Sequence, residues 1–140
     1  LEIGGSYLYG LMHQPDIDLG ITNKDLTKQL YADLGSAFLA SKFVSGVRTA
    51  DRVNFPHKHN RDRPTGYWVS PIIWFGDIEW SCDVWLQKPE WSNGTHSRFS
   101  ESLRSLTEEQ RIIILSLKQD LIAAARYGVG KDFESVDVYD

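Results

Sequence analysis

The chain has 140 residues, of which 41% are hydrophobic and 24% charged, with a formal net charge of −4. This composition is that of one ordinary soluble domain and excludes a disordered or fibrous chain. The negative charge excludes a general nucleic-acid coat, because such proteins need an excess of Lys and Arg to displace counterions. No apolar run approaches the roughly 20 residues of a membrane helix. The single cysteine, Cys82, cannot form an internal disulfide, so we expect a cytoplasmic protein without a membrane partner.

The first part of the chain predicts a strand, a turn, a second strand and a helix. Leu1 to Gly4 forms a short apolar strand that enters a turn at Gly4-Gly5-Ser6. Residues 16–22 (DIDLGIT) alternate polar and apolar positions, which predicts a strand with a polar face at its start. Thr22 or Asn23 can cap the helix that follows. The predicted buried face of this helix holds Leu26, Leu30, Leu34 and Phe38.

The middle of the chain predicts three extended segments. Residues 43–55 form the first, and residues 57–64 (HKHNRDRP) then form a polar, mostly basic loop. Residues 66–75 and 77–87 are rich in aromatic and β-branched side chains, and Gly76-Asp77 between them suits a tight hairpin. In the last of these strands, alternation places Glu79, Ser81, Asp83 and Trp85 on one face and the apolar residues on the other, the core face.

Residues 88–106 predict a loop, and Thr107-Glu108-Glu109-Gln110 is a capping box that opens a helix. We expect this helix to run to about Tyr127 and to end at Gly128 or Gly130. Its expected core face holds Ile114, Leu117, Leu121 and Ala125. The chain opens in a strand and stops without a helix-stop signal, so we expect a domain over residues 1–140 that is trimmed at both ends. The order of elements predicts an α+β fold rather than a doubly wound parallel sheet.

Phosphoryl transfer needs a backbone cradle for phosphates close to carboxylates that hold Mg²⁺. Gly4-Gly5-Ser6 can supply the cradle, because glycine permits close backbone approach and a Ser hydroxyl donates a further hydrogen bond. A helix starting near Tyr7 would add the attraction of its positive end. Asp16 and Asp18 project from the same face of one strand and repel each other unless a cation lies between them. Mg²⁺, which prefers oxygen ligands, is the expected ion.

A third carboxylate is expected from a neighbouring strand, because two metal ions need bridging ligands. Asp83 lies between Cys82 and Val84 in an apolar strand, where an unpartnered charge is costly. Glu79 is the alternative, but it lies nearer the hairpin, so Asp83 is preferred.

These residues resemble a known pattern. Gly5-Ser6-Tyr7-Leu8-Tyr9-Gly10 is followed by Asp16-Ile17-Asp18-Leu19, with nine residues between Ser6 and Asp16. This pattern resembles a minimal nucleotidyltransferase domain of the DNA polymerase beta-like superfamily. Asp83, between two hydrophobic residues, matches the later carboxylate of that family. The resemblance covers roughly residues 1–87, and it departs at Pro15, where many relatives have Ser before the first Asp.

The resemblance implies a nucleotidyltransferase fold, with a mixed, mainly antiparallel sheet of about five strands flanked by helices. It also implies two Mg²⁺ ions and an NTP such as ATP as donor, with a nucleoside monophosphate moved to a hydroxyl and pyrophosphate released. Gly5 and Ser6 would bind the β- and γ-phosphates, and Asp16, Asp18 and Asp83 would be the metal-binding and catalytic residues. The acceptor stays open as a small molecule, a protein or an RNA, and the oligomeric state is open as well.

Several readings remain open beside this one. A catalytically silent or antitoxin-type regulatory protein of the same fold predicts an exposed apolar patch among Tyr7, Tyr9, Leu11 and Met12. Arg48 could reach the phosphates or form a surface ion pair, and Trp85 could stack on a base. The other tryptophans are expected to be mostly core. Side chains of the basic loop could contact triphosphate or an acidic acceptor; these are His57, Lys58, His59, Arg61 and Arg63.

Overall fold

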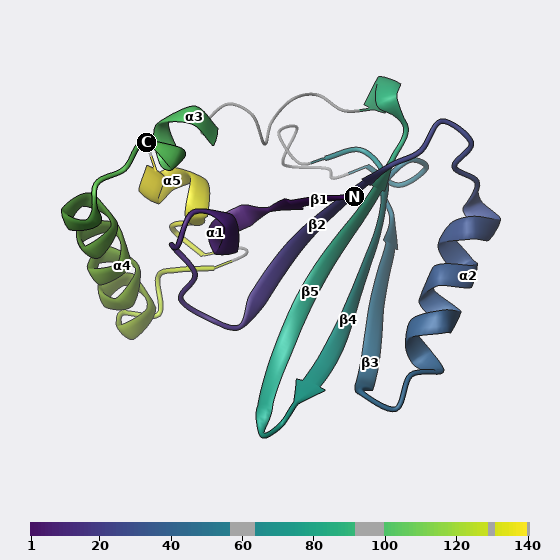
Figure 1. Cartoon of the computed structure of the whole chain (residues 1–140), viewed down its shortest axis with the longest axis horizontal. Coiled ribbons are helices and arrows are strands. Elements are labelled where there is room, and N and C mark those ends of the chain that lie inside the picture. Colours follow the sequence, from purple (N-terminus) through teal and green to yellow (C-terminus); the bar gives the residue numbers. More distant parts are fainter. Residues whose placement is uncertain (57–63, 92–99, 129–130, 140) are drawn as a thin grey trace.

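The computed structural model describes residues 1–56, 64–91, 100–128 and 131–139. Figure 1 shows a twisted sheet with a long helix along one side and a group of short and long helices beyond its opposite edge. The part that builds the sheet contains β1 (Glu2–Gly4), α1 (Gly5–Leu8), β2 (Asp16–Thr22), α2 (Lys28–Leu39), β3 (Val44–Asp51), β4 (Tyr67–Phe75) and β5 (Ile78–Gln87). The rest contains η1 (Pro89–Trp91), α3 (Ser100–Arg104), α4 (Glu108–Ala123) and α5 (Ser135–Tyr139).

The sheet has the order β1-β2-β5-β4-β3. β2 and β5 are parallel, and the other three neighbouring pairs are antiparallel. The expected α+β class with a mixed, mainly antiparallel five-stranded sheet is therefore confirmed. The hairpin at Gly76 is confirmed too, and Gly76 adopts the positive φ of 61° that favours glycine in a tight turn.

One face of the sheet, the α2 face, carries the main core. Alternation buries Cys82, Val84 and Leu86 of β5 against side chains of α2, as the sequence predicts. The expected helix face is right at Leu34 and Phe38, which pack on this core, but Leu30 is 43% exposed. The expected cap is also wrong. Thr27 caps α2 by accepting a hydrogen bond from Leu30 N, whereas the Asn23 side chain accepts one from Asp25 N, ahead of the helix.

A second, smaller core joins the C-terminal helices to the segment after α1. It is built on Tyr9, Leu11 and Leu103, with Leu106, Ile114, Leu115 and Tyr139 packed against it. The expected apolar patch is therefore wrong at Tyr9 and Leu11, which are buried. The predicted loop over residues 88–106 is wrong where it contains η1 and α3, and α5 was not predicted.

The capping box of α4 is confirmed, with both of its hydrogen bonds formed between Thr107 and Gln110. α4 ends earlier than expected, because Ala125 takes the left-handed φ of 56° that was assigned to a later glycine. Its expected core face is wrong at Leu117, which is 44% exposed, and at Ala125, which is exposed. The buried residue of α4 is instead Lys118. None of the described helices combines the length and apolar character needed to cross a bilayer.

Candidate functional site

The other face of the sheet, here called the site face, carries the predicted carboxylates. Asp18 of β2 lies opposite Asp83 of β5, and Asp16 lies opposite Ser81. Neighbouring strands are separated by about 4.8 Å, and opposed residues of parallel strands project to the same side. The pairing of β2 with β5 therefore brings the three carboxylates, two from one strand and one from the other, to one patch.

Gly5 approaches this patch from β1 and α1. Gly4 lies opposite Asp18 in the β1–β2 pair, and Gly5 has a φ of 66°. A Cβ on Gly5 would overlap the carboxylate of Asp18, so only glycine fits this backbone against that side chain. Ser6 follows within α1, and no hydrogen bond to its hydroxyl is found among the described residues. α1 spans only Gly5–Leu8, so the attraction expected from its positive end is small.

The carboxylates lie in an environment that opposes their negative charge. Burial, followed by the charges of Asp16 and Asp83, raises the pKa of Asp18 to about 7. Burial and the charge of Asp83 also raise the pKa of Asp16, although Ser81 and Arg48 partly offset them. Asp16 Oδ1 is buried without a hydrogen-bond partner. A cation between these groups would remove all three costs, since it would offset burial, relieve repulsion and occupy the unpartnered oxygen.

The carboxylates are not gathered into a ready metal site. Across residues 1–56, 64–91, 100–128 and 131–139, no group of three His, Cys, Asp or Glu side chains is arranged to hold a metal ion. The register of β2 and β5 already fixes the backbone positions of Asp16, Asp18 and Asp83. For one ion to bind these carboxylates together, their side chains must therefore rotate, but the pairing of β2 with β5 need not change. The Asp16 oxygen without a hydrogen-bond partner, and Gly5 packed against the Asp18 carboxylate, are compatible with binding of a hard divalent cation.

Glu79, the alternative third ligand, lies away from this patch. It pairs with Trp74 near the end of the β4–β5 hairpin and is exposed. Glu79 also comes before Ser81 in β5, and Ser81 is the residue that lies opposite Asp16. Of the two candidates on β5, Asp83 is the one placed opposite a carboxylate of β2.

Two serines that sequence reasoning did not single out organise the site face. Arg48 of β3 donates hydrogen bonds of 3.2 Å to Ser70 Oγ and to Ser81 Oγ. Its guanidinium also lies 5.8 Å from the ring centre of Trp68. The surface ion pair considered for Arg48 is not formed within the described part of the chain. Alternation in the sequence placed Ser81 on the same face as Asp83, but no local signal links either serine to Arg48.

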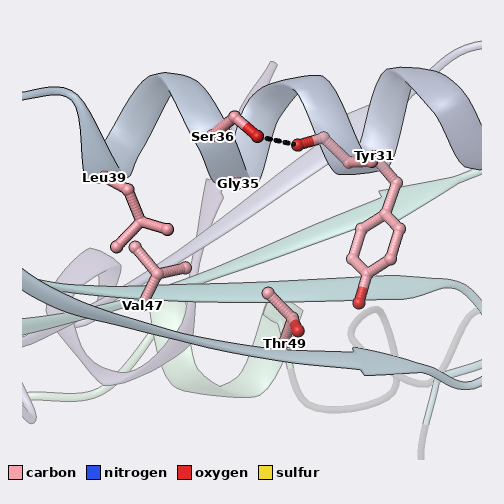
Figure 2. A pocket seen from close by; sticks show the side chains of 7 residues that line it. Tyr31, Gly35, Ser36, Leu39, Val47 and Thr49 are labelled. Carbon is pink, nitrogen blue, oxygen red and sulfur yellow. Dashed lines mark hydrogen bonds between the residues drawn. The ribbon is translucent and has the colours of Figure 1, made fainter.

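A pocket of about 310 Å³ lies between α2 and β3, beside the α2 face (Figure 2). It is lined by Tyr31, Ala32, Gly35, Ser36, Leu39, Val47 and Thr49. The lining contains no carboxylate, amine, imidazole or thiol, so we do not assign chemistry to it. The predicted basic loop over residues 57–63 lies outside the described residues.

Comparison with models of known protein families, with curated proteins and with solved structures gives no match to this chain.

Proposed function

We propose that this chain is a Mg²⁺-dependent nucleotidyltransferase that moves a nucleoside monophosphate from an NTP to a hydroxyl acceptor. One observation carries the proposal: Asp18 lies opposite Asp83, and Gly5 fits against the Asp18 carboxylate where a Cβ would overlap it. Carboxylates from two strands beside a glycine turn are the arrangement that places metal-bound phosphates next to a backbone cradle.

Different residues of the site would bind the donor and the acceptor. Backbone N–H groups at Gly5 and the Ser6 hydroxyl bind the β- and γ-phosphates. Asp16 and Asp18 would hold both Mg²⁺ ions, and Asp83 would hold the ion nearest the acceptor. Bound Mg²⁺ supplies charge neutralisation for the phosphate oxygens and lowers the proton affinity of the acceptor hydroxyl.

The proposed transfer is a single displacement. The acceptor oxygen forms a bond to the α-phosphorus of the NTP, and the bond from that phosphorus to the bridging oxygen breaks. Pyrophosphate leaves with the bridging oxygen, and the proton of the hydroxyl passes to the Asp83 carboxylate. The site needs no histidine base, because a carboxylate lies at the position that faces the acceptor.

The test is transfer of label from each of the NTPs, carrying a labelled α-phosphate, with Mg²⁺ and a cell extract as the source of acceptors. We expect a labelled product and released pyrophosphate with the wild-type protein and neither with Asp16→Ala. Glu79→Gln, which changes a carboxylate of the same strand away from the patch, is the matched control and should leave transfer unchanged.

A second measurement separates donor binding from transfer. NTP with Mg²⁺ should raise the melting temperature of the wild-type protein, because a ligand that binds the folded state stabilises it. Binding without transfer would identify a catalytically silent domain. Absence of both would overturn the proposed function.

A further inference from the structure

Beside the carboxylates, the site face carries two tryptophans at opposed positions. Trp85 of β5 lies opposite Trp68 of β4. The outer neighbours of this pair are Gly20 of β2, opposite Trp85, and Ala50 of β3, opposite Trp68. Two large indoles flanked by two very small residues make a flat apolar strip across the middle of the sheet.

These indoles differ from the aromatic residues of the core. On the α2 face, Tyr67 stacks on Tyr31 at 4.8 Å and meets Trp91 edge-on at 6.0 Å. Within the described part of the chain, Trp68 and Trp85 make no such ring contact with another aromatic side chain. Both are half-buried. The Arg48 guanidinium already lies 5.8 Å from the ring centre of Trp68, so Trp85 is the indole whose position suits a planar group from outside the chain.

Within the described part of the chain, the main helix contacts lie away from this strip. α2 packs on β3 and β4 from the opposite face, and α1 packs on β1 and β2. α4 makes its main helix contact with α5, beyond the β1 edge, as Figure 1 shows. A planar ligand could thus reach the indoles without displacing any of these helices.

Arg48 places a fixed positive charge at the border of the strip. Ser70, which is fully buried, and Ser81 both accept hydrogen bonds from the guanidinium. These acceptors are uncharged hydroxyls, and no carboxylate within the described residues forms an ion pair with Arg48. A guanidinium oriented in this way retains donors for an anion such as a phosphate.

The apolar strip, the Arg48 guanidinium and the carboxylates lie close enough together for one small molecule to contact all three. Trp85 follows Asp83 by two residues on the same face, a separation of roughly 7 Å along the strand. Arg48 pairs with Ser70 on β4, the strand next to β5, and its guanidinium extends to Ser81 of β5. A planar group, a hydroxyl and an anion can therefore be bound at the same time.

We propose that the acceptor is a nucleotide, either free or at the 3′ end of an RNA. Its base stacks on Trp85, its phosphate binds Arg48, and its ribose hydroxyl faces Asp83. This inference rests on the proposed transferase function and names the acceptor for it. The ribose oxygen bonds to the α-phosphorus of the donor NTP, pyrophosphate leaves, and the hydroxyl proton passes to Asp83, so the product is a phosphodiester.

A nucleotide fits better than a tyrosine side chain of a protein substrate. In a nucleotide the sugar separates the base from the hydroxyl, which matches the separation of Trp85 from Asp83. In a phenol the hydroxyl is attached to the stacked ring itself and carries no anion for Arg48. The net charge of −4 argues against a long nucleic-acid contact and favours recognition of one terminal nucleotide.

The test is binding of AMP, adenosine and a short RNA with a free 3′ hydroxyl, without Mg²⁺ or donor, followed by NMR of the indole N–H groups. Trp85→Leu should weaken AMP binding roughly 5-fold or more, since base stacking is worth ~1–3 kcal/mol. Trp74→Leu is the matched control, because Trp74 also lies on the site face of β4 but near the hairpin. Arg48→Met should weaken AMP binding and leave adenosine binding unchanged.

The outcomes separate the two proposals. Equal effects of Trp85→Leu and Trp74→Leu, or AMP binding that Gly5→Ala abolishes, would overturn the nucleotide acceptor. A protein that binds Mg²⁺ and NTP but none of these ligands would overturn the acceptor alone, and one that binds neither would overturn the transferase. Tighter binding of AMP than of the RNA supports a free nucleotide, and the reverse supports an RNA end. Binding of a tyrosyl peptide instead would assign the strip to a protein substrate.

Discussion

Charged side chains are buried in two regions of the molecule, and the partners available to them differ between the two regions. Lys118 of α4 is 1% exposed, yet its Nζ donates to Leu11 O at 3.0 Å and to Tyr139 Oη at 2.8 Å. The rings of Tyr139 and Tyr127 lie 4.7 Å and 5.9 Å from the same nitrogen. Asp16, by contrast, has a buried oxygen without any partner and lies beside Asp18, opposite the strand that carries Asp83.

The difference is between a buried charge whose partners the fold supplies and buried charges whose partners it does not supply. An ammonium group supplied with acceptors and aromatic rings from its own chain is stable as it stands. A buried carboxylate surrounded by like charges is costly until something from outside binds it. Each prediction below tests one side of this contrast.

The largest effect is expected at the carboxylates. Asp83→Asn should reduce transfer by roughly 10²–10³-fold or more while leaving NTP binding largely intact, because it removes the proton acceptor but not the phosphate cradle. The melting temperature should not fall, since the change relieves charge repulsion. Label transfer and thermal unfolding measure the two effects. Unchanged transfer would show that Asp83 is not the third ligand.

The next effect is expected at Lys118, where stability changes and chemistry does not. Lys118→Met keeps the length of the side chain but removes its hydrogen bonds to Leu11 O and Tyr139 Oη. We expect a loss of about 2 kcal/mol in the free energy of unfolding, because the buried Leu11 carbonyl loses its Lys118 donor and an unsatisfied buried group costs ~1–3 kcal/mol. Lys28→Met is the control. Lys28 is 62% exposed and paired with Asp51, so its loss should be smaller.

Two glycines with nearly the same backbone provide the third comparison. Gly5 and Gly76 have φ values of 66° and 61°, but a Cβ at Gly76 would meet nothing within 4 Å. Alanine at either position should cost roughly 1–2 kcal/mol in backbone strain. Only Gly5→Ala should also abolish the rise in melting temperature that Mg²⁺ and NTP produce, because it displaces the Asp18 carboxylate. An equal ligand response in both variants would contradict the role of Gly5.

The smallest effect is a pH dependence of stability. Burial lowers the pKa of Lys118 from 10.5 to about 8. Between these values the unfolded chain binds more protons than the folded one, so the free energy of unfolding rises with pH. The gap in melting temperature between wild type and Lys118→Met should therefore widen from pH 8 to pH 10. A constant or narrowing gap would show that burial does not lower the pKa of Lys118 in the folded protein.

Local patterns in the sequence predicted the elements whose contacts are local. The bounds of β2, the hairpin at Gly76 and the capping box of α4 all follow from residues within a few positions of one another. The face of β5 that carries Asp83 was also predictable, because alternation along a strand has a fixed period. Prediction was wrong where distant partners decide, as at Leu117, which lies exposed on a helix whose buried residue is Lys118.

The sequence by itself determined which residues could perform the chemistry and on which strand face each one lies. Only the tertiary structure decided which of them meet. Asp18 and Asp83 are opposed because β2 and β5 pair in parallel, although β3 and β4 lie between them in the chain. The buried Lys118 finds an acceptor in Leu11 O, 107 residues before it in the chain. Alternation is a property of a few neighbouring residues, whereas strand register and burial depend on how distant segments pack together.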